Sequence, residues 1–233
     1  MIEITWLGHA TFKFRLENGE VIVCDPWLDE KANPVAAKHQ FDRIDYILVS
    51  HGHFDHLGSV VPLAKQFGAT VVGMVELCQW VESKGVKKTS GMNKGGRQAI
   101  GSAQVTMTHA LHSAGIFDDG KMLYGGEPAG FVIHLPDRRN IYFAGDTAVF
   151  SDMSLIRELY HPELALLPIG DHYTMGPDQA ALACRLLQPK RVIPMHYGTF
   201  PILTGTPQQL AAKLAGTCDT EVWELEKGKP VSW

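Results

Sequence analysis

The stretch His51-Gly52-His53-Phe54-Asp55-His56 decides how the rest of this sequence is interpreted. It follows Ile44–Ser50, a short apolar run typical of a buried strand. Side chains two residues apart in an extended segment share one face, so the first two histidines are able to hold one metal ion together. The turn that follows adds a carboxylate and a third imidazole. A polar turn with Asp55 as a helix cap is the other interpretation, but a cap needs no three histidines. The motif therefore predicts a site for two metal ions.

Three later segments also end a predicted strand with a ligand-type residue: Asp146 after Ile141–Ala144, His196 after Arg191–Met195 and His112 after Gln104–His109. A carboxylate at Asp146 is able to bridge two ions. An Asp near a helix start and a loop histidine are the ordinary interpretations of Asp146 and His196. In the third segment His112 lies at the exit of the strand and His109 within it. We therefore favour His112 as the ligand and keep His109 as the alternative.

Strands and helices alternate along the whole chain. Strands are predicted at 2–7, 11–16, 20–24, 44–50, 70–74, 104–109, 131–135, 141–144, 164–169, 191–195 and 221–225, with a hairpin turn at Asn18-Gly19. Helices are predicted at 58–67, 76–83, 152–160, 178–187 and 207–214. The segment Ser113–Gly126, rich in Gly and Asp, is predicted to be a loop. This pattern predicts one layered α/β domain over residues 1–233, with two similar halves at about 1–112 and 113–233.

Composition excludes several classes of protein. The chain has 21 Lys and Arg against 25 Asp and Glu, a net charge of -4, so it offers no basic surface for nucleic acid. No apolar run approaches the ~20 residues of a membrane helix, and we expect no membrane insertion. The N-terminal segment lacks the features of a signal peptide, and the 4 Cys form no C-x-x-C pair. We expect a cytoplasmic protein whose 11 His serve mainly one site.

These residues resemble the metallo-β-lactamase superfamily of metal-dependent hydrolases. The resemblance rests on H-G-H-F-D-H at 51–56, His112, A-G-D-T at 144–147 and His196. Further motifs, such as L-G-H-A-T at 7–11, L-P-I-G at 167–170 and P-M-H-Y-G-T-F-P at 194–201, are similar to a branch of small hydrolases related to L-ascorbate-6-phosphate lactonases. The resemblance implies a four-layer αβ/βα sandwich, in which two mixed β-sheets pack face to face with helices outside.

The resemblance also implies a complete set of metal ligands. The first ion would be held by His51, His53 and His112, the second by Asp55, His56 and His196, with Asp146 bridging them. A set of imidazoles and carboxylates without thiolate suits two Zn²⁺ ions, and also Mn²⁺, Fe or Ni. We expect a hydroxide that bridges the ions to be the nucleophile, because bound metal lowers the pKa of water to ~7.

Other polar residues are candidates for supporting roles. Asp55 is predicted to be catalytic, as acceptor of the water's proton. His9 is favoured as a second catalytic residue that contacts substrate or transition state, and a buried structural histidine is its alternative. Asp25 is predicted either to orient a ligand imidazole or to cap a turn. His172 is predicted either to line the pocket or to lie exposed in a loop.

The function predicted from these residues is hydrolysis of an ester, lactone or phosphodiester bond in a small molecule. The alternative is a non-hydrolytic, metal-dependent sensor or binding protein on the same scaffold, since a scaffold does not determine a function. All seven ligand positions, Asp55 included, are present, which favours catalysis. The resemblance also implies a possible homo-oligomer, because this branch of hydrolases often self-associates.

Overall fold

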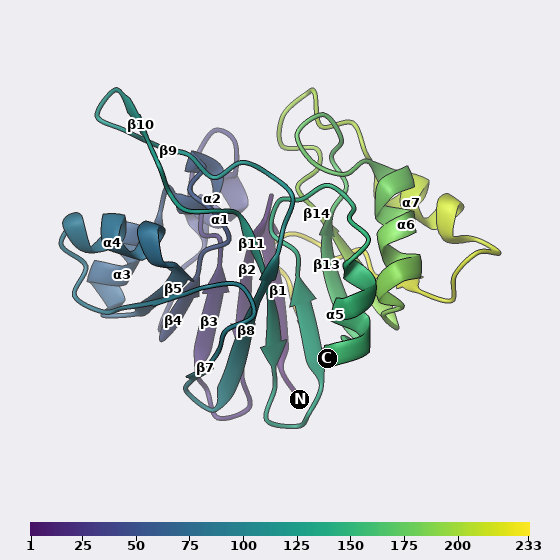
Figure 1. Ribbon diagram of the computed structural model, residues 1–233, viewed down its shortest axis with the longest axis horizontal. Helices are drawn as coiled ribbons and strands as arrows, with labels where there is room; N and C mark the ends of the chain where they lie inside the picture. Colours follow the sequence, from purple (N-terminus) through teal and green to yellow (C-terminus); the bar gives the residue numbers. More distant parts are fainter. The chain divides into compact units, whose positions relative to one another are not determined.

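The computed structural model describes residues Met1–Trp233, and the chain divides into two compact units. Unit 1 comprises Met1–Asn93, Ser113–Pro128 and Leu225–Trp233, and unit 2 comprises Lys94–His112 and Ala129–Glu224. The colours of Figure 1 show this interleaving, since the teal middle of the chain contributes to both units. The division of one domain at about residue 112 stays a prediction, and the two units do not follow that boundary.

Unit 1 is built on a seven-stranded mixed sheet with the order β16-β1-β2-β3-β4-β5-β6. The strands are β1 (Glu3–Gly8), β2 (Thr11–Arg15), β3 (Val21–Cys24), β4 (Tyr46–Leu48), β5 (Thr70–Met74), β6 (Thr89–Met92) and β16 (Pro230–Ser232). Pairing is antiparallel from β16 to β3 and parallel from β3 to β6. The predicted hairpin at Asn18-Gly19 is confirmed, and Gly19 takes the positive φ of 84° that the turn requires.

The helices of unit 1 are α1 (Pro34–Lys38), α2 (Phe54–Leu57), α3 (Val60–Phe67) and α4 (Val75–Ser83). The loop predicted at Ser113–Gly126 is wrong in its middle, where β9 (Ile116–Asp118) and β10 (Lys121–Leu123) form an antiparallel ribbon. Asp119 and Gly120 both have positive φ, 48° and 74°, as a two-residue hairpin turn needs. The Asp-Gly pair was thus a hairpin signal inside a segment whose composition suggested a loop.

Unit 2 is built on a second seven-stranded sheet with the order β15-β14-β13-β12-β11-β8-β7. The strands are β7 (Arg97–Ile100), β8 (Ala103–His109), β11 (Ala129–His134), β12 (Asn140–Phe143), β13 (Leu164–Pro168), β14 (Arg191–Met195) and β15 (Glu221–Val222). Pairing is antiparallel from β7 to β12 and parallel from β12 to β15, the same change of direction as in unit 1.

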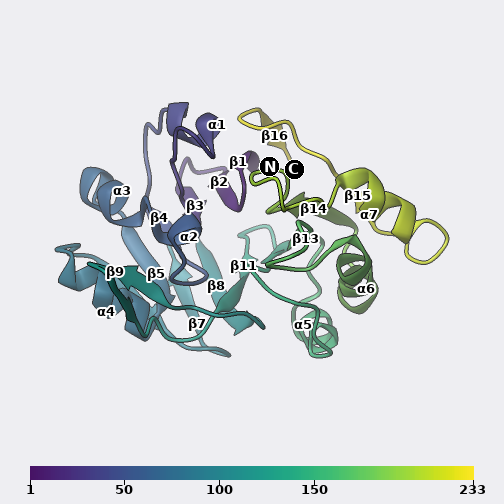
Figure 2. The same ribbon diagram turned by 90° about the horizontal axis from the view of Figure 1, so that it is seen from above.

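Three helices, α5 (Met153–Tyr160), α6 (Pro177–Leu187) and α7 (Pro207–Leu214), lie along one face of this second sheet (Figure 2). Their buried side chains, among them Ile156, Cys184 and Leu210, pack with Val132 and Leu167 from the strands into one apolar core. Two mixed sheets with helices confirm the predicted α/β class. No helix combines the length and apolar content that a bilayer crossing requires.

Candidate metal centre

The candidate ligands and their neighbours follow the ends of strands in both units. In unit 1, Asp25 follows β3 directly and His51 lies just beyond β4. Because β3 and β4 are parallel neighbours, their carboxyl ends meet at one edge of the sheet. Asp25 and His9 have left-handed backbones, with φ of 43° and 52°, which side chains other than Gly seldom adopt. Such strained positions cluster at functional sites.

A fully buried carboxylate, Asp25, organises the candidate ligands of unit 1. It accepts hydrogen bonds from the Ser50 backbone N–H (2.7 Å), the Ser50 hydroxyl (2.5 Å) and Nδ1 of His56 (2.7 Å). Burial raises the pKa of Asp25, while the charge of His56 and the hydrogen bonds from His56 and Ser50 oppose that rise. Of the two roles predicted for Asp25, this arrangement is that of a residue that orients a ligand.

These contacts determine which nitrogen of two histidines is available to a metal. Because Nδ1–H of His56 donates a hydrogen bond to Asp25, Nε2 of His56 carries the lone pair. The Ser50 hydroxyl donates to Asp25, so it accepts from Nδ1 of His51 (2.9 Å), and Nε2 of His51 is again the ligand atom. One carboxylate thus sets the tautomer of two of the predicted ligands, one of them through Ser50. The position of Ser50, directly before the histidine motif, was not interpreted from sequence.

The ring of His53 faces that of His51 through its Nδ1 atom. Nδ1 of His53 lies 2.9 Å from Nε2 of His51, and Nε2 of His53 lies 3.2 Å from the hydroxyl of Ser113. If the hydroxyl accepts from Nε2–H, the lone pair of His53 is on Nδ1 and points at that of His51. A cation between the two nitrogens satisfies both. Two ligand atoms each about 2.0–2.1 Å from one zinc ion lie about 3.4 Å apart at the tetrahedral angle, so this pair fits a somewhat narrower angle.

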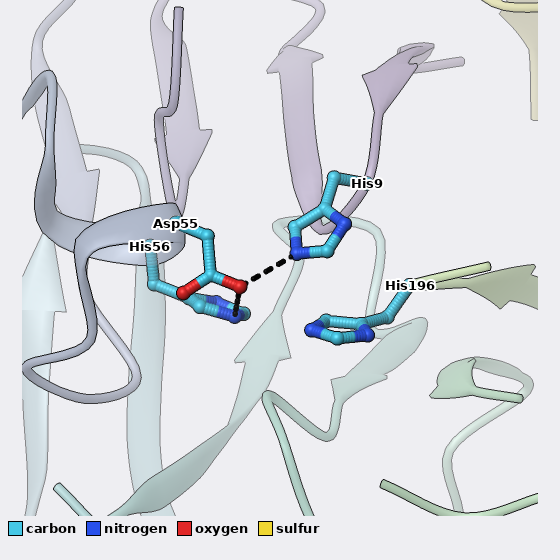
Figure 3. Close-up of side chains that lie close together, drawn as sticks. All are labelled: His9, Asp55, His56 and His196. Atoms are coloured by element: carbon cyan, nitrogen blue, oxygen red, sulfur yellow. Dashed lines mark hydrogen bonds and ion pairs between the residues drawn. The ribbon is translucent and has the colours of Figure 1, made fainter. Parts of the chain in front are cut away.

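Asp55 and His9 form a hydrogen-bonded pair, which Figure 3 shows beside His56. Nε2 of His9 lies 2.9 Å from Oδ2 of Asp55, and Nε2 of His56 lies 3.8 Å from the same oxygen. His9 is fully buried, its ring meets Trp27 edge-on at 5.1 Å, and its carbonyl accepts from the indole of Trp6. His9 therefore reaches the carboxylate predicted to handle the proton.

In unit 2 the carboxylate of Asp146 faces two predicted ligands. Oδ2 of Asp146 lies 3.0 Å from Nε2 of His196 and 3.6 Å from Nε2 of His112. The two histidines belong to different predicted ion sites, so one oxygen is placed as a bridging ligand requires. His109, the alternative to His112, is exposed instead, with Nδ1 3.1 Å from Nζ of Lys94. The geometry favours His112.

The backbone of His196 is held tightly by its neighbours in unit 2. A Cβ at Gly170 would lie 2.1 Å from the carbonyl oxygen of His196, so only glycine fits there. His196 itself is buried and left-handed, with φ of 56°. By contrast, the structure places His172 on the exposed surface, where its ring contacts Tyr173. The exposed-loop interpretation of His172 is the one that this position supports.

Donor chemistry tests whether divalent metal fits these residues. The candidate donors of both units are imidazole nitrogens and carboxylate oxygens, and two of the imidazoles have their ligand nitrogen set by hydrogen bonds. No cysteine belongs to the candidate ligand groups, and burial raises the pKa of the Cys24, Cys78 and Cys184 thiols. The residues fit a hard or borderline cation such as Zn²⁺ or Mn²⁺.

Comparison with known proteins identifies the family. Residues 20–197 match the β-lactamase superfamily domain. A UPF0173 metal-dependent hydrolase of Solibacter usitatus is 63% identical over 233 residues, and the match covers 100% of both chains. The chain belongs to the β-lactamase superfamily. It is a metal-dependent hydrolase, as the sequence predicted, and the non-hydrolytic alternative is not supported by these relatives.

Solved structures extend the comparison to the fold. Igni18, described as a metallo hydrolase from the archaeon Ignicoccus hospitalis, is 33% identical, with a TM-score of 0.85 over 99% of this chain and 97% of its own. CmlA of Streptomyces venezuelae, a diiron β-hydroxylase, shares 15% identity and a TM-score of 0.72, covering 96% of this chain and 53% of that one. The second likeness concerns the fold alone. The predicted metallo-β-lactamase fold is confirmed, whereas the narrower likeness to ascorbate-phosphate lactonases stays a prediction.

Proposed function

We propose that this superfamily member binds two divalent metal ions and uses them to hydrolyse an ester, lactone or phosphodiester bond in a small molecule. The proposed ligands are His51, His53 and His112 for one ion, Asp55, His56 and His196 for the other, and Asp146 between them. The observation that carries this proposal is the Asp25 network, which presents Nε2 of both His51 and His56 as ligand atoms. The shared position of Asp146 between His112 and His196 supports it independently.

The chain's own residues supply the proton chemistry. Bound divalent ions would acidify a water molecule and polarise the bond to be cleaved. Oδ2 of Asp55 is the proposed acceptor of the attacking water's proton. Nε2 of His9 hydrogen-bonds the same oxygen at 2.9 Å, so it holds Asp55 in position and is able to share that proton. This contact gives His9 a defined role beside the predicted contact with substrate.

The identity of the metal follows from ligand chemistry as a proposal. Zn²⁺ is the first choice for five imidazoles and two carboxylates, with Mn²⁺, Fe or Ni as alternatives. The likeness of the fold to a diiron hydroxylase shows that the scaffold alone does not select zinc. A cytoplasmic location, a small-molecule substrate and self-association as a homo-oligomer remain part of the proposal.

Metal analysis combined with one variant tests the proposal. Purified protein, replete with Zn²⁺ or Mn²⁺, should contain about two metal ions per chain, and a panel of lactones, aryl esters, phosphodiesters and thioesters should reveal turnover. Asp55→Ala should lower kcat at least about 100-fold, because a positioned proton acceptor contributes 10²–10⁴-fold. Asp42→Ala is the matched control, since Asp42 is an exposed carboxylate of the same unit paired with Arg15. Fewer than one metal per chain, or full activity in Asp55→Ala, would contradict the proposal.

A further inference from the structure

A second polar site lies in unit 2, at the opposite ends of the strands from Asp146 and His112. It is a pocket of about 440 Å³ between the β7–β8 turn, the β11–β12 turn and the C-terminal end of α5. Figure 1 shows both turns at the lower ends of their strands. The volume is in the range of pockets that hold small molecules. This pocket is separate from the proposed metal ligands.

Two residues of the pocket lining, Asn140 and His134, belong to a row of hydrogen-bonded side chains that ends at the buried Thr106. Asn140 donates through Nδ2 to the carbonyl of Tyr160 (2.6 Å), so its oxygen faces Nδ1 of His134 (2.7 Å) and must accept. His134 therefore carries its proton on Nδ1, and Nε2 accepts from the hydroxyl of Thr106 (2.8 Å). Burial lowers the pKa of His134 and so favours the neutral imidazole, in which Nε2 accepts this hydrogen bond. The side chains of Asn140 and His134 are thus held in place by hydrogen bonds along this row.

The pocket lining also carries two positively charged side chains that have no negative partner. Arg97 and Arg138 line the pocket, and neither side chain makes an ion pair or a hydrogen bond. No Asp or Glu is among the lining residues, and the neighbouring Asp137 is bound by Arg139 at 2.6 and 2.9 Å. In a chain of net charge -4, two such guanidinium groups at one concave site are conspicuous.

The sheet register places Arg97 beside this row of side chains. Arg97 on β7 lies directly opposite Thr106 on β8, and cross-strand partners present their side chains on one face. Burial lowers the pKa of His134, the hydrogen bond with Asn140 opposes this, and the charge of Arg97 lowers it further. The charge of Arg97 thus acts on the row of side chains that joins His134 to Thr106.

We propose that this pocket binds a small organic anion through Arg97 and Arg138. Planar guanidinium groups recognise the oxygens of phosphate and carboxylate, often through two parallel hydrogen bonds. Leu135 and Leu159 also line the pocket and suit an apolar or ring-shaped body attached to the anionic group. The ligand class is therefore a phosphate monoester or a carboxylate on such a body, and it binds apart from the proposed metal centre.

Binding measurements on the full-length, metal-replete protein test this proposal without any assay of hydrolysis. The probes are phenyl phosphate and benzoate. Their binding is measured by calorimetry and by the NMR signals of the His134 ring and the Asn140 side-chain amide. We expect at least one probe to shift both signals. The double variant Arg97→Gln/Arg138→Gln should lower the affinity for that probe at least about 10-fold, because each charge-assisted hydrogen bond contributes strongly to binding. If only phenyl phosphate shifts the signals, the ligand is a phosphate; if only benzoate shifts them, the ligand is a carboxylate.

The control variant is Arg157→Gln, which removes the same charge from α5 of the same unit at a residue that lines a different pocket. It should change the affinity less than about 2-fold, while thermal unfolding confirms that every variant is folded. Binding of a probe at the metal centre would persist in the double variant and leave the His134 and Asn140 signals in place. The proposal is overturned if neither probe moves those signals, or if Arg157→Gln weakens binding as much as the double variant.

Discussion

Replacing Asp25 with Asn changes one buried oxygen to an NH₂ group and leaves the size of the side chain nearly the same. Oδ1 accepts the Ser50 backbone N–H, and Oδ2 accepts both the Ser50 hydroxyl and Nδ1 of His56. An amide has only one oxygen, so at least one buried donor loses its acceptor in either orientation. If the amino group replaces Oδ2, His56 is driven to carry its proton on Nε2, the atom proposed to bind metal.

The expected size of the effect follows from these three hydrogen bonds. A buried donor without its acceptor costs about 1–3 kcal/mol, so the free energy of unfolding of the metal-free protein should fall by at least that amount. Loss of a group that orients a metal-bound histidine lowers metal affinity about 10–100-fold. Competition with a chromogenic chelator measures the affinity, and urea denaturation of metal-free protein measures the stability.

The matched control for this prediction is Asp45→Asn. Asp45 also accepts a backbone N–H in unit 1, that of Val21 at 2.8 Å, but it pairs with Arg43 and contacts no candidate ligand. It should lose some stability and keep its metal affinity. If Asp25→Asn binds metal as tightly as the wild type, or if both variants lose affinity equally, Asp25 does not orient His56 and His51.

Three further predictions concern other parts of the chain. Gly170→Ala should lower the free energy of unfolding by about 1–3 kcal/mol and reduce metal content, because its Cβ would push the carbonyl of His196; normal content by elemental analysis would contradict this. Metal removal by a chelator should lower the thermal midpoint, and added Zn²⁺ should restore it, since binding to the folded state alone stabilises it. Burial and the charge of Lys13 lower the pKa of His39 below 6.5, so the unfolded chain binds more protons just below that pH. The contribution of His39 to stability is therefore present above pH 6.5 and lost as the pH falls through the folded-state pKa. Urea titrations of His39→Gln should show a weaker loss on acidification, and an unchanged pH profile would refute it.

Local sequence was sufficient to predict candidate ligands where the ligand residues and the strand end that carries them lie within a few residues of each other. The run from His51 to His56 predicted a strand end followed by a turn into the helix at 58–67, and the structure has the short helix α2 (Phe54–Leu57) in that turn, before α3. The same reasoning brought Asp146 and His196 to strand ends, and the structure places Asp146 against His196 and His112. Which of His109 and His112 faces inward depended on one strand boundary, and β8 ends at His109.

Pairing between distant segments was beyond the reach of local patterns. β7 and β8 precede residue 112 but belong to the second sheet, where β8 pairs with β11, while β16 returns from the C-terminus to β1. These pairings depend on surfaces that form only when the chain is folded, because strand propensity says nothing about the partner strand. The link from Asp25 through Ser50 to His51 was missed for the same reason, since it joins residues 25 positions apart.

The two sheets explain why similar carboxylates acquire different roles. Asp25 and Ala144 occupy equivalent places, because each N–H donates to a carbonyl of the adjoining parallel strand, that of Leu48 or of Leu166. In unit 1 the carboxylate of Asp25 stands at this place and accepts hydrogen bonds from His56, a proposed ligand, and from Ser50. In unit 2 the small Ala144 stands there, and the carboxylate of Asp146 comes two residues later, where it faces the Nε2 atoms of two histidines. In the proposed centre, the position of the carboxylate along the strand would decide whether it orients a ligand or is itself a ligand. Moving the carboxylate from 146 to 144 should therefore abolish metal bridging without restoring it elsewhere.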